Sequence, residues 1–186
     1  EVDNTWMFGK VFRREFLIQN HIKFHDNLRV HEDSYFLSIV SDLVEKKYLF
    51  PATTYVWRMN FNSITRINDG AYRYSQMPEF IRACMLAAEQ VEKLAPHKMQ
   101  WKIVQFILYN YFSYQMPDWQ DSDKDEYRYK AEHAFVEYVK PFWHYWVETP
   151  LDELVKIYDD ERNRTFRGCI EKETIWDWIR RLKLES

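Results

Sequence analysis

The scarcity of glycine limits what this chain can fold into. Only 3 of its 186 residues are Gly and 6 are Pro, whereas a sheet protein with many tight turns needs both residue types at those turns. Long helices need neither. The hydrophobic fraction of 46% is typical of a folded globular chain, and the length suffices for one core and a second, smaller one. The composition therefore favours a mainly α-helical protein.

The spacing of apolar residues changes near residue 70. Before it, residues 5–12, 48–50 and 53–60 are short and β-prone, and the last of these alternates between two faces. From about residue 72 the spacing is helical almost throughout. We therefore expect a mainly α chain with a small β component (α+β). Residues 1–70 would form one part, and residues 71–186 an α-helical, bundle-like extension.

Two helices are predicted within the first part. The first is a brief helix over residues 13–20 with Phe16 and Leu17 facing inward, and the second is longer. A polar connection over residues 22–30 leads to Glu32 or Asp33, where this helix is expected to begin. Apolar residues then recur at the spacing of a buried helical face. The residues of this face are Phe36, Leu37, Val40, Leu43 and Val44.

Charge and cysteine content narrow the class of protein. The net charge of −3 provides no basic field, so we expect no nucleic-acid partner. No apolar run approaches the roughly 18 residues of a membrane span. The 2 cysteines, Cys84 and Cys169, make neither a disulfide framework nor a metal cluster. We expect a cytoplasmic protein. Peripheral association with the inner face of the membrane stays open, as does a homo-oligomer formed through the extension.

The adjacent acids Glu32 and Asp33 at the predicted helix start allow two interpretations. Acids there are stabilised by free backbone N–H groups and by the helix dipole, so the pair can simply cap the helix. A carboxylate fixed at the rim of a cleft can also remove a proton from an incoming hydroxyl. The two roles are compatible, because a capping acid can also be the base.

Two other groups of residues suggest chemistry. Arg58 ends a predicted strand before a loop rich in Asn, Ser and Thr, and its guanidinium could bind a diphosphate or simply lie in solvent. His21, His25 and His31, with Asp33, suggest a metal-dependent hydrolase. Their spacing fits no common zinc pattern, so we assign no metal ligand in this chain.

Several motifs follow one another over roughly residues 5 to 66. They are Trp6-x-x-x-Lys10-Val11-Phe12-Arg13-Arg14-Glu15-Phe16-Leu17, Asn20-His21-Ile22-Lys23-Phe24, Glu32-Asp33-Ser34-Tyr35-Phe36, Tyr55-Val56-Trp57-Arg58 and Asn62-Ser63-Ile64-Thr65. Their order and spacing resemble the second half of the catalytic domain of family 2 glycosyltransferases. These are inverting enzymes with a single Rossmann-like nucleotide-sugar domain, many of which build bacterial polysaccharides.

The resemblance implies roles for the two adjacent acids. Asp33 would be the base that deprotonates the acceptor hydroxyl, and Glu32 would help to hold the acceptor. The chain would then be part of a hexosyltransferase-like enzyme that moves a sugar, with inversion, from a nucleotide-sugar donor to a glycan or cell-surface polysaccharide acceptor. It would take part in polysaccharide biosynthesis.

The resemblance also implies binding residues. Arg58, with Asn60 or Ser63, would lie near the donor diphosphate, and Trp6 and Lys10 would border the acceptor cleft. A divalent metal, Mg or Mn, is expected at the diphosphate of the complete enzyme, where it neutralises the leaving group.

One departure from the family bears on activity. In the family, a donor-binding half that carries an Asp-x-Asp metal motif precedes the region that this chain resembles. In this chain the Asp-x-Asp sequence Asp123-Lys124-Asp125 follows that region, in a predicted acidic loop, so it cannot be the family's metal motif. His31 also stands where an aromatic or small residue is expected. We therefore expect this chain alone to bind no nucleotide sugar and to be inactive. The rival interpretation is a non-catalytic helical protein-interaction module in which Glu32 and Asp33 only cap a helix.

Overall fold

The computed structural model describes two compact units. The first is Glu1–Pro96 and the second is His97–Ser186. Across both units, the structure describes residues 7–51, 55, 56, 58, 60, 75–108, 125–150, 152, 153 and 156. The predicted boundary at residue 70 lies outside these residues and stays a prediction.

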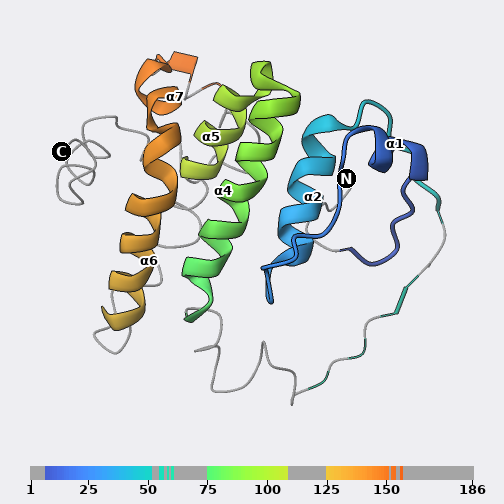
Figure 1. Ribbon diagram of the computed structural model, residues 1–186, viewed down its shortest axis with the longest axis horizontal. Helices are drawn as coiled ribbons and strands as arrows, with labels where there is room; N and C mark the ends of the chain where they lie inside the picture. The colour runs from blue at the N-terminus through green and yellow to red at the C-terminus, as the bar shows by residue number, and fades with distance from the viewer. Residues whose placement is uncertain are drawn as a thin grey trace. The chain divides into compact units, whose positions relative to one another are not determined.

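Every regular element in the described residues is a helix (Figure 1). The first unit holds α1 (Arg14–Gln19), α2 (Glu32–Leu43) and α4 (Met77–Leu94). The 3-10 turn η2 (Pro96–Lys98) follows α4 in the sequence. The second unit holds α5 (Met99–Leu108), α6 (Asp125–Val139), the 3-10 turn η5 (Lys140–Phe142) and α7 (Trp143–Glu148). None of the described helices is long and apolar enough to cross a bilayer.

The core of the first unit forms where α2 packs against α4 (Figure 1). From α2, Phe36, Leu37 and Val40 are buried as their spacing predicts, whereas Leu43 and Val44 are only half-buried. Ile39 is fully buried as well. From α4, the fully buried residues include alanines, whose small side chains let another helix approach closely. These residues are Ile81, Ala83, Ala87, Ala88 and Val91.

The end of α1 is fixed by a Schellman motif. His21 adopts the left-handed conformation (φ 52°), the N–H of Ile22 donates to the Leu17 carbonyl at 2.8 Å, and the N–H of His21 donates to the Ile18 carbonyl at 3.1 Å. Glycine usually fills this position because it has no Cβ. Ile22 is 6% exposed, which matches the apolar contact that accompanies the motif. His21 therefore has a structural role at the end of a helix.

The mainly helical class is confirmed, but the β segments are wrong wherever the structure describes them. Residues 7–12 form a turn followed by coil, and residues 48–50 carry no strand. A strand requires a neighbouring strand to complete its hydrogen bonds, and the described residues provide none. The third predicted strand, residues 53–60, lies partly outside the described residues. Its described positions, 55, 56, 58 and 60, carry no strand.

The second unit has a core of its own. α5 packs against α7, and the side chains at its centre are large and apolar. Those that are fully buried include Met99, Ile103, Ile107, Phe135 and Trp146.

A buried hydroxyl joins α5 to the end of α7. Thr149 is fully buried, donates from Oγ1 to the Tyr145 carbonyl at 2.6 Å and accepts from Nε2 of Gln100 at 2.9 Å. We expect Thr149→Val to lower the free energy of unfolding by about 1–3 kcal/mol, because two polar partners lose their bond while the side-chain shape is kept. Thr149→Ser keeps the hydroxyl and should cost less. Urea denaturation of both variants tests this, and a Val variant as stable as the parent would contradict it.

Candidate functional site

The candidate site begins at the first turn of α2. The helix starts at Glu32, as predicted, and Asp33 follows half-buried while Glu32 is exposed. Oδ1 of Asp33 accepts the backbone N–H of Ser34 at 2.7 Å and a longer bond from the Ser34 hydroxyl at 3.5 Å. No hydrogen bond from the described residues reaches Oδ2. One carboxylate oxygen therefore stabilises the helix start, and the other is left for a second partner.

Aromatic contacts attach two preceding segments to α2. The ring of Phe36 meets the ring of Phe12 edge-on, with centroids 5.3 Å apart. It stacks on Phe24 with centroids 4.7 Å apart. Phe36 lies one helical turn after Asp33. Residues 7–12 and 22–30 are therefore held beside the helix that carries the candidate base.

A second aromatic contact brings in the segment of Arg58. Phe8 and Tyr55 stack with centroids 4.4 Å apart and an interplanar angle of 4°. Phe8 precedes Lys10 by two positions, and Tyr55 precedes Arg58 by three. Residues 7–12 therefore contact Tyr55 near one end and α2 at the other. Three segments of the proposed motif order meet within the first unit.

The structure describes some of the predicted site residues and not others. Arg58 and Asn60 are exposed and Lys10 is half-buried. Trp6 and Ser63 lie outside the described residues. Among the described residues, neither Asp33 nor Glu32 forms an ion pair. The contacts that gather the segments are aromatic, so the roles of the charged residues stay predictions.

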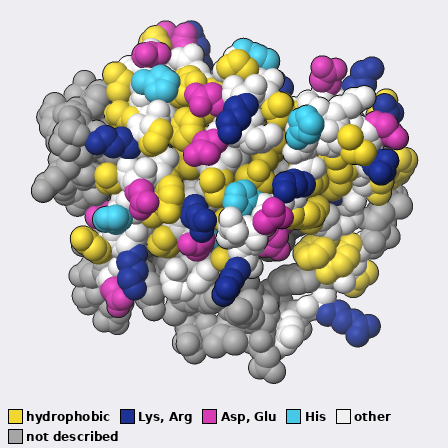
Figure 2. All heavy atoms as spheres, viewed as in Figure 1, with side chains coloured by type: hydrophobic (Ala, Val, Ile, Leu, Met, Phe, Trp, Pro, Cys, Tyr) yellow, Lys and Arg dark blue, Asp and Glu magenta, His cyan; other side chains and the backbone are white. Residues whose placement is uncertain are grey.

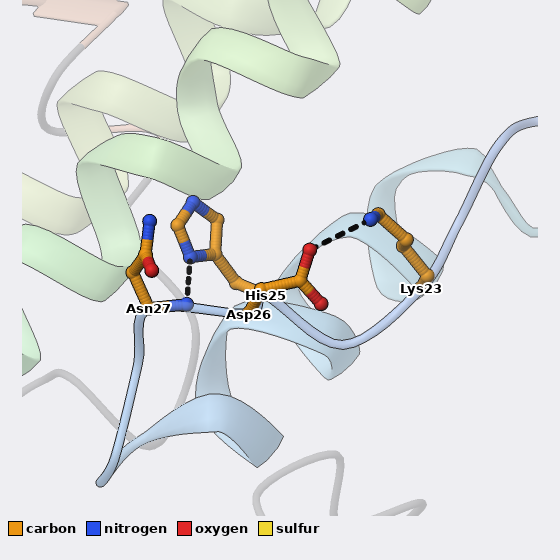
Figure 3. A network of polar contacts seen from close by, with 4 residues as sticks. All are labelled: Lys23, His25, Asp26 and Asn27. Atoms are coloured by element: carbon orange, nitrogen blue, oxygen red, sulfur yellow. Dashed lines mark hydrogen bonds and ion pairs between the residues drawn. The ribbon is translucent and has the colours of Figure 1, made fainter.

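The loop before α2 is held by its own polar contacts (Figure 3). Nζ of Lys23 lies 3.0 Å from Oδ2 of Asp26, and this hydrogen bond and ion pair lower the pKa of the exposed Asp26 carboxyl. The N–H of Asn27 donates to Nδ1 of His25 at 3.2 Å. The ring of His25 meets the ring of Tyr35 edge-on, with centroids 5.2 Å apart. The loop is therefore ordered next to the first half of α2.

These contacts test the alternative interpretation of a metal-dependent hydrolase, in which His21, His25, His31 and Asp33 would hold the metal. His21 sits at the end of α1, and Nδ1 of His25 already accepts a backbone N–H. In the part of the chain that the structure describes, no three His, Cys, Asp or Glu side chains lie close enough together to hold a metal ion. The described residues therefore do not fit a divalent cation.

His31 is the residue with the most unusual environment in this region. It precedes α2 in the left-handed conformation, with φ 61° and ψ 19°, which is uncommon for a residue with a Cβ. Its ring meets the Phe80 ring of α4 edge-on at 5.3 Å, and Nε2 is buried with no hydrogen-bond partner among the described residues. Burial lowers the pKa of the His31 imidazole, and the opposing effect of the Asp33, Glu32 and Glu79 carboxylates is smaller.

The lowered pKa of His31 predicts how stability depends on pH. In the unfolded chain the imidazole binds a proton near pH 6.5, whereas in the folded chain it does so only at lower pH. The unfolded state therefore binds more protons just below pH 6.5, and the free energy of unfolding should fall as the pH falls through this window. His31→Asn, which tolerates the left-handed conformation, should flatten the slope. His97→Asn, an exposed control, should not. Denaturation between pH 5 and 7.5 measures this, and equal slopes in all three proteins would contradict it.

Two features of this region were not predicted from the sequence. One is the place of His31 at the helix start, although a residue directly before two helix-opening acids occupies the N-cap position. The other is the stacking of Phe8 on Tyr55, because no local pattern connects residues so far apart in the sequence.

Comparison with known proteins adds no family to these observations. No family model, curated protein or solved structure matches the chain.

Proposed function

We propose that this chain is the acceptor-side part of an inverting family 2 glycosyltransferase. The complete cytoplasmic enzyme would transfer a sugar from a nucleotide-sugar donor to a glycan or cell-surface polysaccharide acceptor. The observation that carries the proposal is the half-buried Asp33 at the start of α2, with residues 7–12 and 22–30 attached to the same helix through Phe36. These segments belong to the motif order that resembles the family.

In this proposal Asp33 acts as the general base. The N–H of Ser34 holds Oδ1, which orients the carboxylate, and Oδ2 takes the proton of the acceptor hydroxyl as its oxygen attacks the anomeric carbon. The bond from that carbon to the nucleoside diphosphate breaks on the opposite face, and its electron pair leaves with the diphosphate. Attack from one face and departure from the other invert the configuration. Positioned proton transfer of this kind contributes about 10²–10⁴-fold to a rate.

The remaining residues would bind substrates. Arg58 is exposed, so its guanidinium is open to a diphosphate, whose oxygens it matches in a bidentate manner. Asn60 or Ser63 would assist it, and Trp6 and Lys10 would border the acceptor. Mg or Mn would neutralise the leaving group in the complete enzyme, held by residues other than those described.

Acceptor-dependent release of nucleoside diphosphate tests the proposal. The protein encoded by the complete reading frame would be incubated with a panel of nucleotide sugars and a polysaccharide acceptor in a magnesium buffer. We expect one donor to release diphosphate faster when the acceptor is present. Rates independent of the acceptor for every donor would contradict the proposal.

A second candidate function is a non-catalytic interaction module, and one observation favours it. The 2.7 Å bond from the Ser34 N–H to Asp33 is the contact that a helix-stabilising acid makes. In that case, Asp33 would affect only the stability of α2. Asp33→Asn, which keeps a side-chain oxygen as acceptor, separates the two functions because only a base needs the ionisable carboxyl.

A further inference from the structure

The segment after α2 exposes three large apolar side chains in succession. Tyr48 is 78% exposed, Leu49 67% and Phe50 78%. Such residues are unremarkable on a surface when they are scattered singly, but a contiguous group marks an interaction site. The segment forms neither helix nor strand. Its side chains therefore project from an open loop.

Two exposed lysines, Lys46 and Lys47, directly precede these apolar residues. Both are open to an external anion, since no contact with another described residue engages either side chain. Glu45 is exposed on the other side of the lysines and offsets part of their charge. Figure 2 shows hydrophobic side chains lying among Lys and Arg side chains on the right-hand part of the visible face.

We propose that residues 46–51 form a docking surface for an anionic lipid membrane. Tyr favours the interfacial region of a bilayer, and Phe and Leu are residues that interfacial segments bury at the headgroup boundary. Lysines near an anionic surface are attracted to lipid phosphates and carboxylates. A loop cannot enter the hydrocarbon region, because its backbone groups would lose their hydrogen bonds with water. The side chains of Tyr48, Leu49 and Phe50 therefore reach the headgroup boundary while the backbone stays hydrated.

The position of the charges favours a membrane over a purely apolar partner. A second copy of this chain or an apolar groove on another protein would have to remove Lys46 and Lys47 from water or leave them at its rim. A lipid surface accepts both lysines at the level of its headgroups, where the side chains can extend from their apolar stems. This docking does not rest on the proposed transferase activity.

Vesicle co-sedimentation of the whole chain tests the proposal. The vesicles would contain phosphatidylcholine alone or with 30% phosphatidylserine. We expect the parent chain to bind the anionic vesicles and to dissociate as salt is raised. Lys46→Gln with Lys47→Gln should weaken this binding about twenty-five-fold, at about fivefold for each lysine. Glu45→Gln should strengthen it several-fold, because it removes the opposing charge.

Matched variants distinguish the effect of this segment on vesicle binding from the effect of charged or apolar residues elsewhere on the surface. Arg29→Gln with Lys93→Gln removes two exposed positive charges elsewhere and should change binding less than twofold. Leu49→Ser with Phe50→Ser should abolish binding, whereas Tyr129→Ser, at a site 69% exposed in the second unit, should not.

The proposal is overturned if the parent chain does not sediment with anionic vesicles. It is also overturned if Arg29→Gln with Lys93→Gln weakens vesicle binding as much as Lys46→Gln with Lys47→Gln does. A third result would overturn it as well. If the parent chain self-associates without binding lipid, and Leu49→Ser with Phe50→Ser abolishes the self-association, then a second copy of the chain occupies this surface.

Discussion

Asp33→Asn in the complete enzyme is expected to lower kcat by about 10²–10⁴-fold, which is the range that a general base contributes. The amide oxygen of Asn can still accept the Ser34 N–H that Oδ1 accepts at 2.7 Å. It cannot take a proton from an acceptor hydroxyl. The fold should therefore survive while transfer is lost. Turnover and the thermal midpoint, measured on the same preparation, separate the two effects.

Controls for this prediction come from nearby acids. Asp26→Asn removes an exposed carboxylate from the loop before α2 and should leave kcat within about twofold of the parent. Glu32→Gln should mainly raise KM, because Glu32 is proposed to hold the acceptor. Near-normal turnover of Asp33→Asn would remove the base assignment and leave the interaction module as the better account.

Ile39→Ala is expected to lower the free energy of unfolding by about 2–5 kcal/mol, the usual cost of a cavity at a fully buried aliphatic residue. Ile39 is 0% exposed in α2, where it belongs to the core formed with α4. A domain is commonly stable by only about 5–15 kcal/mol. The variant would therefore lose a large fraction of its stability, and the helix that carries Asp33 would loosen with it.

The matched control for this prediction is Ile18→Ala. Ile18 is 54% exposed on α1, so the same chemical change should cost less than about 0.5 kcal/mol. Guanidinium denaturation monitored by circular dichroism compares the two variants. Equal midpoints for the Ile39 and Ile18 variants would show that α2 is not anchored by this core.

The helices were predictable because their signal is local. Phe36, Leu37 and Val40 in α2 recur at the helical period, and all three are buried. The β segments were not predictable in the same way. Tyr48 and Phe50 are β-prone, but strand formation depends on a hydrogen-bonding neighbour that local sequence does not specify.

The candidate site was only partly predictable. The start of α2 at Glu32 follows from the acids that open the helix. The left-handed backbone of His21 and His31 could not be expected, because neither residue is glycine and each conformation is imposed by its neighbours. The stacking of Phe8 on Tyr55 depends on the path of the chain between them, which no periodicity encodes.

The configuration of the transferred sugar tests the central claim most directly. Proton NMR of the product formed by the protein of the complete reading frame would give the configuration at the anomeric carbon. We predict inversion relative to the nucleotide-sugar donor, with product formed by Asp33→Asn at least about a hundredfold more slowly. A product with retained configuration, or no transfer from any donor, would contradict the account.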